Sequence, residues 1–170
     1  TISEPNIQSL VQKLSLVTKD DYIVLSGSVP KNLPEDIYQR IMKEVSNTGA
    51  KIVLDTRKKY LEYGLEMKPF LVKPNKDELE EIFGVFIETK EDIEKYAKKL
   101  QQSGAENVLV SLGKDGAMLL DSNGKVHYQN APKGKLINSV GAGDSMVAGF
   151  LAGYIQSDGN YEEALITGVA

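Results

Sequence analysis

The sequence predicts an α/β fold, a three-layer αβα sandwich in which helices cover both faces of a mainly parallel sheet. Short apolar segments alternate with longer segments of helical periodicity. The apolar segments are continuous, which is typical of strands buried on both faces. The connections are short and rich in turn residues, without internal repeats or a low-complexity linker. We therefore expect a single α/β domain over residues 1–170.

Six short segments are expected to be strands, because they are apolar and bounded by turn or polar residues. They are Asp21–Gly27, Lys51–Asp55, Phe70–Lys73, Asn107–Leu112, Ala117–Leu120 and Lys125–Tyr128. In a parallel sheet, ligands bind beyond the carboxyl ends of the strands. Those ends carry small and polar residues that suit a phosphate group: 26–28, Asp55, 73–75 and 111–113.

Helices are expected where apolar residues recur at helical spacing or where a start signal precedes them. The first follows Ser3-Glu4-Pro5 and contains Ile7, Leu10, Val11, Leu14 and Val17; the others are Pro34–Asn47, Asn75–Phe83, Lys90–Gln102, Ala142–Ile155 and Tyr161–Ala170. The basic cluster Arg57-Lys58-Lys59 is interpreted as a solvated loop or a helix start. The small residues Ala148, Gly149, Ala152 and Gly153 are expected to let a helix pack closely on the sheet.

Composition narrows the function. The chain has no cysteine and one histidine, which excludes disulfides, thiolate zinc sites, thiol nucleophiles and a multi-histidine metal site. The net charge of −4 argues against nucleic acid as a partner. No apolar run approaches the roughly 18 residues of a membrane span, so no membrane partner is expected. The absence of cysteine suits a cytoplasmic location, which we expect.

The segment Gly141-Ala142-Gly143-Asp144 precedes an apolar helix. Its glycines allow a turn with positive φ, and the helix start adds unpaired N–H groups and a positive dipole end. An acid beside such an anion hole fits proton removal from a hydroxyl that attacks a phosphoryl group. The alternative is that Asp144 is an ordinary helix N-cap. A dinucleotide fingerprint is excluded because Met146 stands where it requires glycine.

Two further segments carry weaker signals. Ser111 to Gly116 (SLGKDG) lies between two strands, where it is either a simple hairpin or a backbone platform for a nucleotide. Asn75 and Glu78 are three residues apart in the first turn of a helix. They either form a capping box or hold a hydrated magnesium ion through water.

In this order, the segments resemble the ribokinase-like (PfkB) carbohydrate kinases, the family of the fructokinase-type phosphofructokinases. Asn138–Gly149 (NSVGAGDSMVAG) is similar to the family's C-terminal signature, and Leu25–Pro30 (LSGSVP), Lys73-Pro74-Asn75 with Glu78, and the Ser111–Gly116 segment occur where the family has them. The resemblance covers essentially the whole chain and implies a truncated ribokinase-like fold. Among subfamilies, the segments look most like 1-phosphofructokinase and next like tagatose-6-phosphate kinase.

The resemblance implies roles for individual residues. Asp144 would be the base that deprotonates the acceptor hydroxyl, and the amides of Gly141, Ala142 and Gly143 would form the anion hole. The ATP site would include Lys73, Asn75, Gly143 and the run Ser111, Leu112, Gly113, Lys114, Asp115 and Gly116. Glu78 corresponds to the acidic position linked to Mg2+, and Ser26 and Ser28 would lie near the phosphosugar.

The expected activity is ATP-dependent phosphorylation of the 6-hydroxyl of fructose 1-phosphate. The alternatives are tagatose-6-phosphate kinase and a non-catalytic ATP-binding fragment. Two departures from the family accompany this expectation. Thr56-Arg57-Lys58 follows Asp55 where the family often has small residues, and the family's N-terminal half, with most sugar contacts and the lid, is absent. Because that lid commonly mediates dimers, the resemblance leaves room for a homodimer of the full-length protein.

Overall fold

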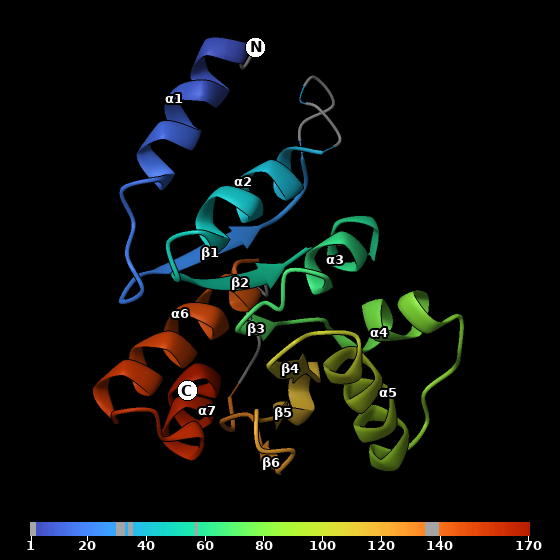
Figure 1. Cartoon of the computed structure of the whole chain (residues 1–170). Coiled ribbons are helices and arrows are strands. Elements are labelled where there is room, and N and C mark those ends of the chain that lie inside the picture. The colour runs from blue at the N-terminus through green and yellow to red at the C-terminus, as the bar shows by residue number, and fades with distance from the viewer. Residues whose placement is uncertain (1–2, 30–32, 34–35, 57, 135–139) are drawn as a thin grey trace.

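The computed structural model describes residues 3–29, 33, 36–56, 58–134 and 140–170. Its described residues form one sheet of six strands in the order β1 to β6 (Figure 1). The strands are β1 (Tyr22–Ser26), β2 (Lys51–Asp55), β3 (Leu71–Val72), β4 (Asn107–Ser111), β5 (Ala117–Leu120) and β6 (Val126–Gln129). The first four run parallel, whereas β5 and β6 pair antiparallel. The prediction of a mainly parallel α/β sheet is confirmed.

Seven helices lie in the described part of the chain: α1 (Glu4–Leu14), α2 (Ile37–Ser46), α3 (Lys58–Leu65), α4 (Lys76–Phe83), α5 (Lys90–Gln102), α6 (Ala142–Gln156) and α7 (Tyr161–Val169). Six of them were predicted from the sequence. The seventh, α3, begins within the basic cluster, so the interpretation of Lys58 and Lys59 as a helix start is confirmed; Arg57 lies outside the described residues.

The third strand is shorter than expected, since it comprises only Leu71 and Val72 rather than 70–73. Pro69 and Pro74 flank the segment, and proline has no N–H with which to extend a ladder. The Lys73 amide nevertheless donates to the Leu54 carbonyl at 2.9 Å. The chain thus stays aligned with β2 up to the point where Lys73 must be placed.

Helices pack on both faces of the sheet, as predicted (Figure 1). Helices α1 to α5 contribute side chains such as Ile7, Met42 and Leu79 to the core on one face. Helices α6 and α7 cover the opposite face, where Phe150 is fully buried against the strands. None of the described helices is long and apolar enough to cross a bilayer.

The glycines of α6 serve a different contact from the one expected. A Cβ on Gly149 would lie 2.6 Å from the Thr167 carbonyl oxygen, and one on Gly153 would lie 2.9 Å from Ala164 Cα. Both neighbours belong to α7, so these two residues permit close packing between helices. The expectation that they pack against the sheet is wrong, because α7 crosses over the face of α6 that carries them.

The close α6–α7 contact makes a stability prediction. Replacing Gly149 by Ala should lower the free energy of unfolding by about 1–3 kcal/mol, because the new methyl group collides with α7 backbone. Alanine is the better helix former by about 1 kcal/mol, so propensity alone predicts the opposite sign. Urea denaturation measures the difference. Gly134→Ala is the control, since a Cβ there meets nothing within 4 Å; equal stability of the two variants would contradict the packing argument.

Candidate active site

The carboxyl ends of the parallel strands meet at one edge of the sheet, as the sequence predicted. Ser26 at the end of β1 lies opposite Asp55 at the end of β2. An isolated parallel bridge joins Asn75, just beyond β3, to Ser111 at the end of β4. Four segments that are distant in sequence therefore deliver polar side chains to the same edge.

The turn that opens α6 lies over this edge. Gly141 is the N-cap, with φ of 80° and ψ of −2°, a left-handed conformation that favours glycine. No side chain caps the helix, and its first turn contains Ala142, Gly143 and Asp144. The amides of a helix's first turn have no partner within the helix, so they are available to an anion.

Asp144 does not cap the helix. Its carboxylate Oδ1 instead accepts a hydrogen bond of 2.9 Å from the Ser26 hydroxyl. The interpretation of Asp144 as an N-cap is therefore wrong, because Gly141 occupies that position and Asp144 is the third helical residue. Asp144 is exposed to solvent.

An ion pair with one buried and one partly buried partner lies directly beneath the turn. Lys73 Nζ is 3.1 Å from Asp55 Oδ1, and the two side chains are 6% and 17% exposed. A Cβ on Gly143 would lie only 3.1 Å from Lys73 Nζ. Glycine at 143 thus lets the helix start approach the ammonium group, and Asp55 Oδ2 lies 3.8 Å from the same Cβ position, so both charges of the pair lie beneath the turn.

A cavity of about 560 Å³ adjoins the ion pair and the turn, and its volume falls within the range of small-molecule sites. It is lined by Lys73, Asn75, Lys76, Asp77, Ser111, Leu112, Gly113, Ala142, Gly143 and Met146. Six residues expected at the ATP site are therefore brought together here: Lys73, Asn75, Ser111, Leu112, Gly113 and Gly143. The cavity thus places these six residues beside the turn that opens α6.

The other half of the Ser111–Gly116 segment does not line this cavity. Residues 111 to 117 form the hairpin between β4 and β5, with a 3-10 turn at Gly113–Asp115. Lys114 and Asp115 are exposed. Gly116 is buried, and any Cβ on it would collide with the Gln129 carbonyl oxygen and the backbone of 130–131. The hairpin alternative is confirmed, and close backbone approach accounts for the glycine at 116.

Asn75 and Glu78 form the capping box that the sequence left as an alternative. The backbone N–H of Glu78 donates to Asn75 Oδ1 at 2.8 Å, and the backbone N–H of Asn75 donates to Glu78 Oε2 at 2.9 Å. Asp77, not Glu78, is the carboxylate that lines the cavity. Within the described residues, no three acidic or histidine side chains cluster to hold a metal ion.

The remaining predicted positions lie at the margin. Ser28 is exposed on the loop after β1. Pro30 of the SGSVP segment, together with Asn138 and Ser139 of the C-terminal signature, lies outside the described residues.

Sequence reasoning missed three residues that hold the site together. Asp55 was noted only as a strand end, although an acid at that place could have been paired with Lys73. Tyr38 of α2 and Thr56 both donate to backbone carbonyls of the turn after β1. Nothing in the sequence pattern of Tyr38 distinguishes it from an ordinary amphipathic helix residue.

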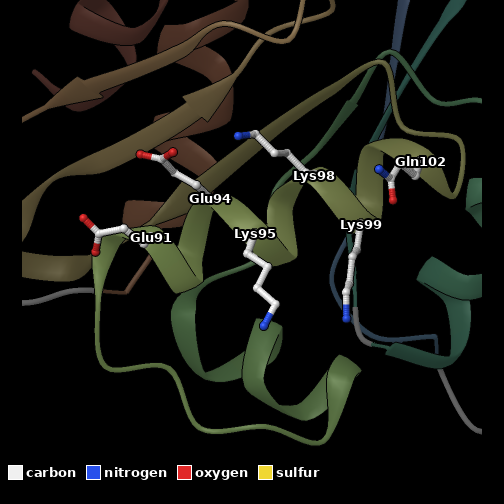
Figure 2. A pocket seen from close by; sticks show the side chains of 6 residues that line it. All are labelled: Glu91, Glu94, Lys95, Lys98, Lys99 and Gln102. Carbon is white, nitrogen blue, oxygen red and sulfur yellow. The ribbon is translucent and has the colours of Figure 1, made fainter.

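A second hollow, of about 490 Å³, lacks the features of a binding site. Its lining residues are Glu91, Glu94, Lys95, Lys98, Lys99 and Gln102, all of α5. Figure 2 shows that Lys95 and Lys99 point to the opposite side of the helix from Glu94 and Lys98. The Lys99 ammonium lies over the rings of Tyr96 and Phe83. Because these groups diverge, we assign no site to this face.

Comparison with known proteins shows the family to which the chain belongs. The model of the pfkB family carbohydrate kinases matches residues 1–170. The chain belongs to the pfkB family. Its fold also matches the crystal structure of a putative phosphofructokinase from Staphylococcus aureus, with a TM-score of 0.90 and 39% sequence identity over 99% of this chain and 54% of that one.

Two curated relatives of this pfkB family chain have names that specify a substrate. A 1-phosphofructokinase of Bacillus subtilis is 46% identical over 169 residues, which are 99% of this chain and 55% of the relative. A D-tagatose-1-phosphate kinase of Bacillus licheniformis is 36% identical over 151 residues, 88% of this chain and 49% of the relative. The chain spans about half the length of the curated relatives it matches.

The ion pair beneath the turn predicts an asymmetric effect of removing either partner. Asp55→Asn should cost about 3 kcal/mol of unfolding free energy, because it leaves the ammonium of Lys73 buried without a counter-charge. Lys73→Met should cost less, since Asp55 is the more exposed partner and can regain water. Urea denaturation of both single variants and the double variant provides the measurement. If the two losses simply add in the double variant, the side chains are not coupled as the structure indicates.

Proposed function

We propose that Asp144 is the base of an ATP-dependent sugar-phosphate kinase, and that the cavity beside the turn of residues 141–143 forms much of its nucleotide site. The proposed reaction is transfer of the γ-phosphoryl group of ATP to the 6-hydroxyl of fructose 1-phosphate, giving fructose 1,6-bisphosphate and ADP. One observation carries the proposal: Asp144, held by Ser26, stands at the rim of an open helix start that lies on the Lys73 ammonium.

Proton removal is assigned to Asp144. Oδ1 accepts from Ser26, and among the described residues no other donor to the carboxylate is present, so we assign Oδ2 to the acceptor hydroxyl. As the sugar oxygen forms its bond to the γ-phosphorus, its proton passes to Asp144. The bond from the γ-phosphorus to the bridging oxygen breaks, and the electron pair leaves with ADP. Positioning and charge stabilisation supply most of the rate in such a transfer.

Charge stabilisation is assigned to the turn and the lysine. Negative charge on the transferring group faces the first-turn amides of α6, including those of Ala142 and Gly143. Lys73 lies against Gly143 from below, so its charge acts on the same place. Its tie to Asp55 keeps the ammonium in position before any substrate binds.

Nucleotide binding is assigned to the cavity beside the turn. Ser111, Leu112 and Gly113 line the cavity, and Asn75 lies beside Ser111 at the start of α4. Lys114, Asp115 and Gly116 remain proposed members of the ATP site through the family resemblance. In the structure they form the outer part of the hairpin.

The residues present fit a magnesium ion that is held mainly by phosphates and water. When bound, such an ion neutralises charge on the phosphate oxygens. Glu78 uses Oε2 for the capping box, which leaves Oε1 for a water molecule of the ion. Asp77 lines the cavity and is the second carboxylate within reach of this region.

The names of two relatives suggest two different acceptor sugars. The 1-phosphofructokinase relative supports fructose 1-phosphate, and the tagatose-phosphate kinase relative supports a tagatose phosphate as the second candidate. That relative is named for the 1-phosphate, whereas the sequence suggested the 6-phosphate. Competition between fructose 1-phosphate, tagatose 1-phosphate and tagatose 6-phosphate, compared as kcat/KM for the complete natural protein, decides among them.

A non-catalytic nucleotide-binding role is the second candidate function. It requires only the cavity beside the turn, which six residues expected at the ATP site line. It predicts that the 170-residue chain binds ATP but phosphorylates no sugar. Calorimetric titration with ATP, alongside a coupled assay with the same three sugars, distinguishes the two functions.

Asp144→Asn tests the base directly, because asparagine retains an oxygen that accepts from Ser26 but cannot take a proton. In the complete natural protein, kcat should fall by about 10²- to 10⁴-fold, as expected for a lost general base. The dissociation constant for ATP should stay within about threefold of the original value, because the amides of the turn remain. Asp20→Asn, at the opposite end of the sheet, is the control. Near-normal turnover of Asp144→Asn would overturn the assignment.

Glu78→Gln tests the link to magnesium while preserving the capping box, since the glutamine oxygen can still accept from Asn75. The Mg2+ concentration for half-maximal activity should rise about tenfold, as for loss of one hydrogen bond to a charged group. Asp77→Asn is the matched comparison. If Asp77→Asn shifts the Mg2+ requirement and Glu78→Gln does not, Glu78 is only a cap and the metal role belongs to Asp77.

A further inference from the structure

We propose that Tyr38 and Thr56 are positioning residues for catalysis, because they fix the turn after β1 that presents Ser26 to Asp144. This inference rests on the proposed role of Asp144 as the base. It assigns a role to two residues that the family resemblance leaves without one, and it changes the role expected of Ser26.

The first step is the contact between Ser26 and the base. These residues are 118 positions apart, and their hydrogen bond joins the end of β1 to the start of α6. A carboxylate with one oxygen engaged has its rotation restricted, so its second oxygen keeps one direction. Ser26 thereby orients Asp144 toward the acceptor hydroxyl, acting through the carboxylate and without touching the substrate.

The second step is what holds Ser26. Gly27 has φ of +84°, a conformation that favours glycine. Hydrogen bonds to backbone carbonyls hold this turn, and Val29 beyond it packs against the core. The Tyr38 hydroxyl lies 3.2 Å from the Ser26 carbonyl oxygen and 3.3 Å from that of Gly27. The Gly27 carbonyl also accepts from Thr56 Oγ1 at 3.3 Å.

The third step is what holds the two donors. A tyrosine hydroxyl is protonated at neutral pH and can donate there, and burial raises the pKa of Tyr38 further. The Tyr38 ring packs against Tyr60 of α3, with centroids 5.1 Å apart. Thr56 directly follows Asp55, whose carbonyl oxygen accepts from the Gly27 amide at 3.0 Å.

These contacts connect Asp144, the proposed base, to the Lys73 ammonium group. Asp55 holds Lys73 through its side chain and holds Gly27 through its carbonyl. The end of β2 therefore positions the Lys73 ammonium group beneath the turn. Together with Tyr38 and Thr56, it also positions Ser26, which orients Asp144. Thr56 occupies the position at which the sequence departs from the small residues common in the family.

The experiment is a double-mutant cycle in the complete natural protein, with kcat, both KM values and thermal melting measured for each variant. Tyr38→Phe keeps the ring against Tyr60 and should lower kcat about fivefold, as for loss of a neutral hydrogen bond. Ser26→Ala should lower kcat about 10- to 100-fold, because its bond is to a charged group. Ser26→Thr, which restores a hydroxyl, should recover most of that loss.

Coupling is the decisive readout. If Tyr38 acts through Ser26, the double variant should be no slower than Ser26→Ala alone. Thr56→Val, which leaves Tyr38 in place, should show the same coupling and guards against poor folding of a single variant. Tyr63→Phe is the matched control, because Tyr63 is an exposed tyrosine of α3; its kcat should be unchanged.

Three results would overturn the inference: wild-type kcat in both Tyr38→Phe and Thr56→Val, effects that multiply fully in the double variant, or Ser26→Ala raising only the KM for the sugar phosphate. The last result would make Ser26 a substrate contact. Failure of the proposed function is distinguishable, because it appears as normal turnover of Asp144→Asn. An inactive Asp144→Asn with unaffected Tyr38→Phe removes the positioning role alone.

Discussion

The ion pair between Lys73 and Asp55 is the interaction on which the rest of the site depends. Moving two charges out of water is costly, and the cost is offset only where the geometry is good and further partners are present. Here the 3.1 Å pair lies beneath Gly143, where the helix start can approach because residue 143 has no side chain. The pair thus joins the ends of β2 and β3 beneath the start of α6, and in the proposed function its ammonium group faces the transferring phosphoryl group.

The sheet topology explains how distant segments meet at this pair. Parallel strands place all their carboxyl ends at one edge, so Ser26, Asp55 and Ser111 converge although the loops and helices between them differ in length. Helix α6 crosses the same edge with its amino end, and α7 packs on its glycines to hold it there. The arrangement of the site therefore depends mainly on the backbone positions of the strand ends and of the helix start, and few charged side chains take part.

Much of the fold and part of the candidate site could be predicted from the sequence, because strands, helix starts and turns depend mainly on local sequence patterns. Continuous apolar runs identified all six strands of the described residues, and the glycines of residues 141–143 identified the turn that opens α6. What failed depended on tertiary contacts. The sequence could not show that Gly141 caps α6 and frees Asp144 for Ser26, or that Gly149 faces a helix. Tyr38 went unnoticed because a helical tyrosine carries no signal until its hydroxyl is seen on a particular carbonyl.

The central claim is that Lys73 and the amides above it stabilise charge that develops during phosphoryl transfer. The affinity of the complete natural protein for ADP with aluminium fluoride, a mimic of the transferring group, tests it most directly when compared with ADP alone. Interactions that favour the transition state strengthen binding of the mimic more than binding of the product. The account predicts that Lys73→Met weakens binding of the mimic at least about tenfold more than it weakens binding of ADP. Equal losses for both ligands would show that Lys73 only binds nucleotide, and would contradict it.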